Sequence, residues 1–445
     1  MLAALRSRVI KAIDVTNPDA PRLSAEFGGF DSYVSAVAVS EDGQRVVGAG
    51  ADNTLRIFSL NSPSEPPTVL IGSSNAASVQ IFGTNIVASS DDGRVQDWPV
   101  IADVTKASAN NVYQIPANGA GTGLLAADTE TDGRITQWRI DTDRLVRRGP
   151  DLIPSPGMVY SGAVVLSPSG RVATMGTVTG TVHFADYSDP SNPRVVGSVE
   201  AKQTLNETVD YSERSGVAVT GATDSNSLVI IDATDLKAPR VVANVDVGGG
   251  VWWASLSPDG TTVAAATATG AIKLFDVSNP SKPRAYPDPI TFEGAALAVR
   301  FDAQGTRIVA SSDERSVIVA DISDPEKPRR TFELAGPAGQ LYSAGLSSDG
   351  NKVIAGGSNS EVWVWDLRNG GQPSVVLRSF PGRVYDVRFI PGDRILAAGQ
   401  GGVIQSWRAD AEERIATECA RQGDQLTESE WRAYVSGMSY QPPCR

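Results

Sequence analysis

One short unit recurs along this chain and limits what the chain can fold into. Its clearest copy is AIKLFDVSNPSKPR, residues 271–284, and related copies end at Arg22, Arg194, Arg240 and Arg329. The last four arginines of the series are 46, 44 and 45 residues apart (240−194, 284−240 and 329−284). Each copy is an apolar strand, then Asp, then a turn that contains proline, which fixes φ, lacks an amide donor and so ends the strand. Such a period predicts an array of similar small β-sheets.

Further strands and turns can be placed around each copy. The third strand of the unit recurs nine times, at 55–60, 95–100, 135–140, 182–187, 228–233, 272–277, 317–322, 362–367 and 403–408. Turns rich in Asp, Asn and Gly, such as SPDG at 257–260 and SSDG at 347–350, favour tight hairpins between the strands. No helical period appears before residue 409. The sequence therefore predicts an all-β β-propeller of about 40–47 residues per four-stranded blade, with nine copies plus a partial one.

The number of copies allows two arrangements. In the first, residues 103–408 form a seven-bladed ring, and residues 1–102 hold a partial blade and two leading blades of another ring. In the second, residues 16–408 form one larger ring, in which the strand at 21–27 completes the blade of 384–408. We favour the first, because the sequence opens part-way through a repeat. Residues 409–423 have helix-forming composition, and Thr427 with Glu430 completes a capping box, so residues 409–445 are predicted to form a short helical appendix.

Charge and hydropathy exclude several function classes. The formal net charge is −12, which disfavours binding to the phosphate backbone of nucleic acid. No apolar run approaches the ~20 residues of a membrane helix, and the arginines near the N-terminus do not fit a signal peptide. We expect a cytoplasmic protein. The alternative is an extracytoplasmic face, if a longer parent protein has an upstream membrane helix.

Few residues suggest catalysis or metal binding. The single histidine, His183, lies within an expected strand, and the two cysteines exclude a cysteine zinc cluster. The aspartates that recur at the ends of the third strands, such as Asp232 and Asp276, are expected to cap turns. We therefore predict no catalytic residues, no metal site and no cofactor.

The two cysteines, Cys419 and Cys444, lie together in the C-terminal tail. A disulfide between them would close a loop of about 25 residues and add around 3 kcal/mol of stability in the chain-entropy model. The alternative is two free thiols, which the cytosol would keep reduced.

The SPDG turns, the Asp-Gly hairpins and the strand ending in Trp365-Asp366 resemble WD-repeat β-propellers over residues 9–408. The fold class that follows is an all-β, WD-repeat-like β-propeller. Only one copy has the Trp-Asp dipeptide and no Gly-His pair occurs, so the hydrogen-bonded tetrad of orthodox members is missing. Cohesion between blades must then come mainly from apolar packing.

The tail carries a second resemblance. The residues that carry it are Cys419, Leu426-Thr427, Glu430-Trp431, Tyr434, Tyr440 and Cys444. Their pattern is similar to that of the C-terminal tail of bacterial, chiefly actinobacterial, WD-repeat proteins. In that group the propeller often follows a STAND-type nucleotide-binding module. No GxxxxGK[S/T] stretch occurs here. The resemblance implies a sensor or scaffold portion that accompanies upstream domains of a longer parent protein.

Aromatic residues are the best candidates for a binding site. Five residues before the serine of the SPDG-type turns stand Trp252 and Tyr342, and the matching place before Pro391 holds Tyr385. In the resembled family this place is the start of the innermost strand, at the mouth of the central channel. Trp253 would face the opposite way, into the core. The three aromatics would suit a protein or peptide partner, and the alternative is that they pack between blades.

We therefore expect a non-enzymatic propeller that serves as a protein-interaction, scaffold or sensor module in a larger signalling or defence-type protein. The alternative is a propeller enzyme of the hydrolase or lactonase type with a site at the channel mouth. Such a site needs several His, Glu or Asp side chains in the channel, and one histidine fits that poorly.

Overall fold

The computed structural model describes residues 2–3 and 8–408, apart from short gaps at 31, 41–42, 53, 61–62, 64–66, 72–75, 83–84, 91–94, 100–102, 108–110, 128–133, 142–143, 154–158, 204–205, 378–379, 381 and 393. Within these ranges the chain is built from antiparallel β-strands and two short 3-10 helices, η1 (Leu367–Asn369) and η2 (Gln400–Gly402). The helical appendix expected at 409–445, with Cys419 and Cys444, lies outside the described residues.

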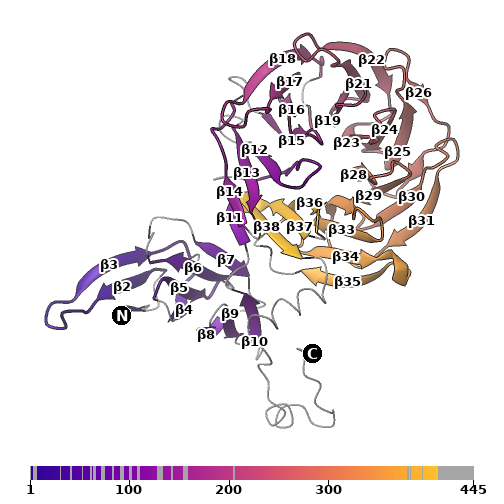
Figure 1. The fold of residues 1–445 in the computed structure, drawn as a ribbon. Helices are drawn as coiled ribbons and strands as arrows, with labels where there is room; N and C mark the ends of the chain where they lie inside the picture. Colours follow the sequence, from indigo (N-terminus) through magenta and orange to yellow (C-terminus); the bar gives the residue numbers. More distant parts are fainter. Residues whose placement is uncertain are drawn as a thin grey trace.

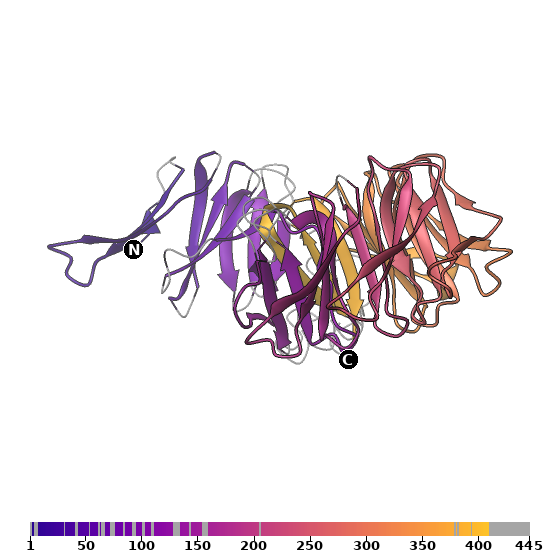
Figure 2. The same cartoon turned by 90° about the horizontal axis from the view of Figure 1, so that it is seen from above.

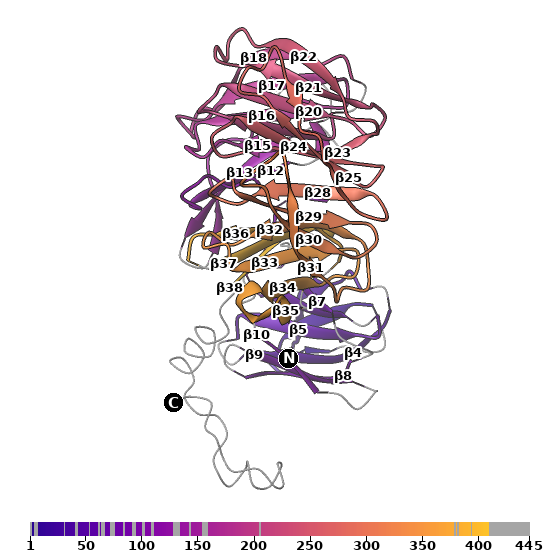
Figure 3. The same ribbon diagram turned by 90° about the vertical axis from the view of Figure 1, so that its right-hand side faces the viewer.

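Three sheets come first along the chain. They are β1–β3 (Leu2–Ala3, Ile10–Asp14, Arg22–Phe27), β4–β7 (Val34–Val39, Arg45–Gly50, Thr54–Ser59, Thr68–Ile71) and β8–β10 (Ala76–Phe82, Asn85–Ser90, Val95–Pro99). Neighbouring sheets pack through their apolar faces: Val47 and Ile57 of the β4–β7 sheet, for example, pack against Val79 and Ile86 of the β8–β10 sheet. Figures 1 and 3 show these sheets as a separate row beside the rest of the molecule.

Seven further sheets follow and surround a central axis (Figure 1). The first four in chain order are β12–β14 (Gly123–Ala127, Ile135–Asp141, Arg144–Arg147); β15–β18 (Val159–Leu166, Val172–Thr177, Thr181–Asp186, Arg194–Glu200); β19–β22 (Thr208–Ser212, Val217–Gly221, Ser227–Asp232, Arg240–Asp246); and β23–β27 (Val251–Leu256, Thr262–Thr267, Ala271–Asp276, Arg284–Ala285, Ile290–Thr291). The last three are β28–β31 (Ala296–Phe301, Arg307–Ser312, Val317–Asp321, Arg329–Leu334); β32–β35 (Leu341–Leu346, Lys352–Gly357, Val362–Asp366, Gln372–Leu377); and β36–β38 (Val384–Ile390, Arg394–Gly399, Val403–Arg408) with β11 (Asp103–Lys106). In the first of these sheets, residues 111–117 form the innermost segment, which is joined to β12 by the bridge between Ala117 and Leu124. The predicted all-β propeller fold is confirmed.

The last sheet is completed by the first strand of the ring. β11 pairs with β38, so that Asp103 stands opposite Ser406 and Lys106 opposite Val403. The strand at 22–27 is β3, which pairs with β2 in the first sheet. The outer strand beside the 384–408 sheet is therefore residues 103–106, and the strand expected there in the larger-ring arrangement lies elsewhere. Figure 2, which views the same ribbon from above, shows the leading sheets extending to one side of the ring.

The recurring Asp and Arg of the repeat form one local motif. One carboxylate oxygen of Asp232 accepts hydrogen bonds from the Thr234 amide and hydroxyl, at 3.1 and 2.7 Å. Its other oxygen binds Arg240 at 2.7 Å. The same Asp–Arg ion pair occurs in three further blades, at Asp186–Arg194, Asp276–Arg284 and Asp321–Arg329. The turn-capping role predicted for these aspartates is confirmed, and it explains why the arginine recurs with them.

Blades are held together mainly by apolar contacts between neighbouring sheets, as the sequence predicts. Val219 and Ile230 of one blade pack against Leu256 and Val263 of the next, and all four are buried. Each such side chain contributes roughly 1.5–3 kcal/mol when fully buried. Trp365, from the single Trp-Asp dipeptide, is fully buried, and its indole N–H donates to the Ala335 carbonyl at 3.2 Å. His183 on β17 is also buried, with Nδ1 2.6 Å from the Ser198 hydroxyl.

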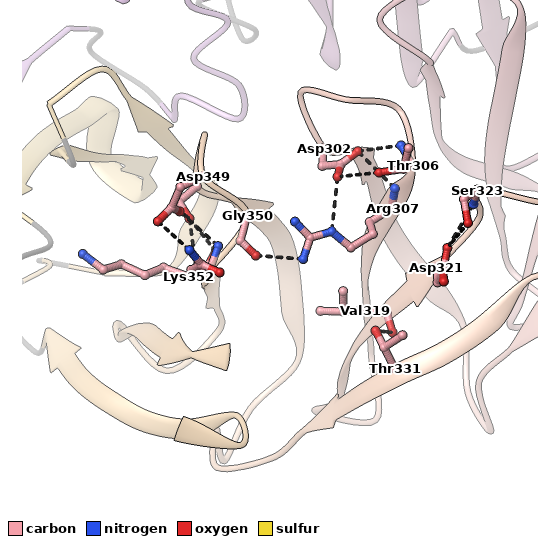
Figure 4. Close-up of polar contacts among 12 residues, drawn as sticks. Asp302, Thr306, Arg307, Val319, Asp321, Ser323, Thr331, Asp349, Gly350 and Lys352 are labelled. Carbon is pink, nitrogen blue, oxygen red and sulfur yellow. Dashed lines mark hydrogen bonds and ion pairs between the residues drawn. The ribbon is translucent and has the colours of Figure 1, made fainter. Parts of the chain in front are cut away.

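A polar contact at one turn also links two blades (Figure 4). Asp302 accepts hydrogen bonds from the amides of Thr306 and Arg307, at 2.8 and 3.0 Å, and closes the turn between β28 and β29. The guanidinium of Arg307 binds Asp302 and then donates to the carbonyl of Gly350 in the next blade, at 2.9 Å. The turn residues therefore position the neighbouring blade as well as their own strand.

Candidate partner-binding site at the channel mouth

The starts of the innermost strands lie at one end of the ring. Because each blade is antiparallel, these starts share a face with the turns between the second and third strands. Counting five residues back from the first residue of the turn after each innermost strand gives one position per blade. In chain order the seven positions hold Tyr113, Gly162, Glu207, Trp252, Leu297, Tyr342 and Tyr385.

Three of these residues form a row of tyrosine rings. The rings of Tyr113 and Tyr385 are stacked with their centroids 4.3 Å apart, and those of Tyr385 and Tyr342 are tilted with centroids 5.6 Å apart. The three side chains come from the first, last and second-last blades of the ring, which are neighbours once β11 has joined β38. All three are half-buried, so each ring keeps part of its surface open to solvent.

Trp252 occupies the same position in another part of the ring. Its side chain is 40% exposed, more than that of any tyrosine in the row. Leu297 stands on the blade between Trp252 and Tyr342, and it is half-buried. The structure thus brings Tyr342 and Tyr385 together and keeps Trp252 two blades away. Trp253 packs against the core cluster of Ile272 and Ile308, as expected.

Tyr113 is a member that the sequence reasoning missed. The signal was present, because the turn after the segment 111–117 begins at Asn118, whose carbonyl accepts the Gly121 amide at 2.8 Å. This turn, NGAG, does not match the SPDG pattern, although the same count of five residues from Asn118 leads back to Tyr113.

Amide side chains surround the tyrosine row. The Tyr342 hydroxyl donates to Gln340 Oε1 at 3.3 Å, and the Asn111 amide donates to the Tyr113 hydroxyl at 3.2 Å. Asn111 also accepts the Gly401 amide of the last blade at 3.0 Å. Burial, followed by the nearby Tyr113, raises the pKa of the Tyr385 hydroxyl, while Arg383 acts in the opposite direction. The row is therefore an apolar surface with neutral hydrogen-bonding groups and one cation at its edge.

One residue further along the innermost segments, a belt of buried polar contacts joins neighbouring blades. At four junctions between blades, an inner-strand side chain accepts a hydrogen bond from a backbone amide of the next blade. The pairs are Gln114 with Val164 (3.1 Å), Thr208 with Ala254 (3.0 Å), Ser343 with Val387 (3.2 Å) and Asp386 with Ile115 (3.0 Å). Because unsatisfied buried donors and acceptors are costly, these contacts set the positions of adjacent blades.

Arg300 crosses the same belt and contacts three other blades. Its guanidinium binds Asp386 Oδ1 at 2.6 Å and donates to the carbonyls of Ala344 and Val387, both at 2.9 Å. It also lies over the Trp253 ring, 4.7 Å from the centroid. Burial disfavours the ionised Asp386 carboxyl, but Arg300, Arg388 and the Ile115 amide outweigh it, so the pKa of Asp386 lies below its usual range.

A second buried carboxyl, Asp210, lies in a different environment. It accepts the amides of Leu256 and Tyr211 at 2.7 and 2.8 Å. Burial nevertheless dominates and raises the pKa of Asp210. Neither carboxyl belongs to a metal-binding cluster, because the described part of the chain has no group of three or more His, Cys, Asp or Glu side chains that could hold a metal ion.

A known family matches part of the chain. The family described as WD domain, G-beta repeat matches residues 21–59, which span β3 to β6. No curated protein shows significant similarity to the chain. Among the described residues, no helix is long and apolar enough to cross a membrane.

Proposed function

We propose that this WD-repeat-like β-propeller is a non-enzymatic interaction module that binds a protein or peptide partner at the mouth of its central channel. WD repeats generally mediate protein–protein interaction or scaffolding, and a WD repeat is the family that this chain matches. The observation that carries the proposal is the contact of Tyr113, Tyr385 and Tyr342 across three blades. With Leu297 and Trp252 they make an apolar arc over five consecutive blades, which we call the channel-mouth arc.

The chemistry of the arc suits a polypeptide. Tyrosine and tryptophan bury a large area, and their few rotatable bonds keep the entropic cost of binding small. The tyrosine rings already pack against one another, and the belt of Asp386, Gln114 and Ser343 contacts holds their strands in place. A surface arranged before binding loses less free energy to ordering. Asn111 and Gln340 can exchange hydrogen bonds with a partner's backbone at the edge of the row.

The test is selection of peptides from a random displayed library on the full chain, followed by affinity measurements on variants. Tyr385→Ala and Tyr342→Ala should each weaken selected peptides about 30-fold or more, the loss of a hot spot worth about 2 kcal/mol. Tyr33, which is 44% exposed on a leading sheet, provides the matched control, and Tyr33→Ala should leave the affinity unchanged. Peptides that bind all three variants equally would exclude the arc as the binding site.

We also infer how the module is organised. Residues 103–408 act as the ring, since β11 closes onto β38. Residues 1–102 supply the leading blades of a second ring, and 409–445 a tail. The tail resemblance supports a place in a larger bacterial protein of signalling or defence type that contains a STAND-type module, and we propose a cytoplasmic location for it. Limited proteolysis tests the organisation, because the first cuts should fall near 100–102 and after 408.

A further inference from the structure

Charged side chains converge on the axis of the ring, beyond the belt of buried polar contacts. On each innermost segment the belt residue directly follows the channel-mouth residue, and the side chain two residues after it lies on the same face. In chain order these seven positions, which we call the axial layer, hold Pro116, Val165, Asp210, Ser255, Arg300, Gly345 and Arg388. Figure 1 shows the strands of the three charged residues, β19, β28 and β36, around the centre of the ring.

Each charged residue of the layer is flanked by two apolar residues that pack in the core between blades. The flanking pairs are Val209 with Tyr211, Val299 with Phe301, and Val387 with Phe389. Asp210, Arg300 and Arg388 therefore leave the opposite face of their strands, towards the axis. Burial raises the pKa of the Asp210 carboxyl, while the charge of Arg388 acts in the opposite direction. These two residues belong to the third and the seventh sheets of the ring, so they interact across the axis.

The layer is reached from the end of the ring that carries the SPDG-type turns. Six belt positions are buried, and they are Gln114, Ala163, Thr208, Ala298, Ser343 and Asp386. In the axial layer, Val165, Arg300 and Arg388 keep part of their surface exposed. The side chains of the two arginines are 13% and 23% exposed. The belt thus separates the axial layer from the channel-mouth arc, and the layer opens towards the turns.

Two arginines of the layer share one carboxylate. Asp386 of the belt binds Arg300 at 2.6 Å and the Nε of Arg388 at 3.3 Å. Asp210 accepts two backbone amides instead, and within the described part of the chain it forms no ion pair. Since burial raises the pKa of Asp210, its negative charge near the axis is also weakened. The direct contacts of the layer therefore lack one negative charge.

Arg388 also has donors to spare. Its Nε donates to Asp386, while its two terminal nitrogens donate to no residue that the structure describes. Arg300, in contrast, uses both of its terminal nitrogens within the protein. The planar fork of a guanidinium matches the two oxygens of a carboxylate, and such charge-assisted pairs are roughly twice as strong as neutral hydrogen bonds.

We propose that the axial layer binds a carboxylate group, which enters from the turn end of the ring and pairs with the terminal nitrogens of Arg388. The ligand supplies the negative charge that the two arginines and their shared aspartate lack. Two sources have this chemistry: a small carboxylate ion, and an Asp or Glu side chain of a separate polypeptide. The site lies apart from the channel-mouth arc and is independent of the function proposed for it.

The first test is a titration of the full chain with sodium formate at constant ionic strength. Binding is followed by saturation transfer from the protein to the formate proton in NMR spectra. An ion this small binds no tighter than about 1 mM, so the titration extends to about 50 mM. Saturable binding to the wild type is expected, and its absence would overturn the proposal.

Variants of Arg388 assign the site. Arg388→Gln should abolish formate binding. Arg388→Lys should weaken it about tenfold, because the ammonium keeps the charge beside Asp386 but loses the two-pronged contact. The lysine variant decides the matter even if the glutamine variant does not fold. Arg329→Gln removes an exposed arginine and should leave the affinity unchanged. Wild-type affinity in both Arg388 variants would refute the assignment.

Asp210 provides an independent check. Its carboxyl is a like charge to the ligand, so Asp210→Asn should bind formate at least as tightly as the wild type. Weaker binding by this variant would contradict the charge argument and overturn the proposal. Tyr385→Ala should bind formate normally, which separates this site from the channel-mouth arc.

Two capped peptides distinguish the sources of the carboxylate. One has a single glutamate between runs of glycine, and the other has glutamine in its place. Tighter binding of the glutamate peptide than of formate would assign the site to a polypeptide side chain, and the reverse order would assign it to a small ion. Both results support a carboxylate site. Equal binding of the two peptides would show that the carboxylate is not recognised, and the proposal would fail.

Discussion

Asp386 accepts a hydrogen bond from the backbone N–H of Ile115, 3.0 Å away, across the junction between the last blade of the ring and the first. The same carboxylate binds Arg300, which comes from the third-last blade. It also accepts the Ser343 hydroxyl at 2.8 Å, and its side chain has no exposed surface. One buried carboxylate therefore holds the closure of the ring and supports the tyrosine row above it.

Loss of this carboxylate should be severely destabilising. Asp386→Ala leaves the Arg300 guanidinium buried without its partner, and breaking a buried ion pair in this way costs about 3–5 kcal/mol. Urea unfolding of the two proteins measures the difference. Arg329→Ala serves as the control, because the Arg329–Asp321 pair is exposed and worth about 0–1 kcal/mol. Similar losses in the two variants would show that Asp386 has no special role.

Replacing Ser360 by glycine should stabilise the protein. Ser360 ends the turn between β33 and β34 with φ at 63°, the left-handed region, where Gly180 and Gly270 stand in other blades. A residue with a side chain is strained there by roughly 1–2 kcal/mol, and the entropy of glycine offsets part of this, so the gain should be about 0.5–1 kcal/mol. Thermal unfolding measures it.

The reverse change gives the contrast. Gly270→Ser should destabilise by more than Ser360→Gly stabilises, because the added Cβ would meet the backbone carbonyl of Gly294 in addition to adopting the strained φ. If the two changes had effects of the same sign, backbone strain at this turn would not be the cause.

The single histidine should titrate below its usual range. Burial lowers the pKa of His183, although Glu200 acts in the opposite direction. The unfolded chain then binds the proton first, so the contribution to stability is complete above pH 6.5 and falls as the pH drops below 6.5. One titrating imidazole resonance should appear in the proton NMR spectrum, with a midpoint under 6.5. His183→Gln should flatten the stability profile just below pH 6.5, and an unchanged slope would refute the assignment.

The capping carboxylates should make the protein sensitive to acid. Hydrogen bonds from the Thr234 hydroxyl, the Arg240 guanidinium and the Thr234 amide lower the pKa of Asp232 from 3.8 to about 2. A depressed folded-state pKa gives stability that is present above pH ~4 and lost as the pH falls towards 2. The urea midpoints of the wild type and Asp232→Asn should differ at pH 5 and converge at pH 2. A constant difference between them would contradict this linkage.

Much of the blade architecture could be predicted from local patterns. The third strands, the hairpin turns and the capping role of Asp232 and Asp276 depend on residues close in sequence, whose hydrogen bonds reach only a few positions along the chain. Nine copies and a partial one therefore correspond to the ten sheets formed by the described residues. His183 as a strand residue and Trp253 as a core residue follow from the same alternation of faces.

The arrangement of the blades required the three-dimensional structure. From local pattern alone, β11 could pair with β10, its neighbour in sequence, or with β38, because both strands are third strands with the same Gln-x-Trp pattern. Their competition is resolved by closure of the ring, which brings the two ends of residues 103–408 together. Closure also places Tyr113 on Tyr385 and Asp386 on the Ile115 amide. These contacts join residues more than 250 positions apart, and such proximity arises from packing of whole sheets, which no short stretch of sequence encodes.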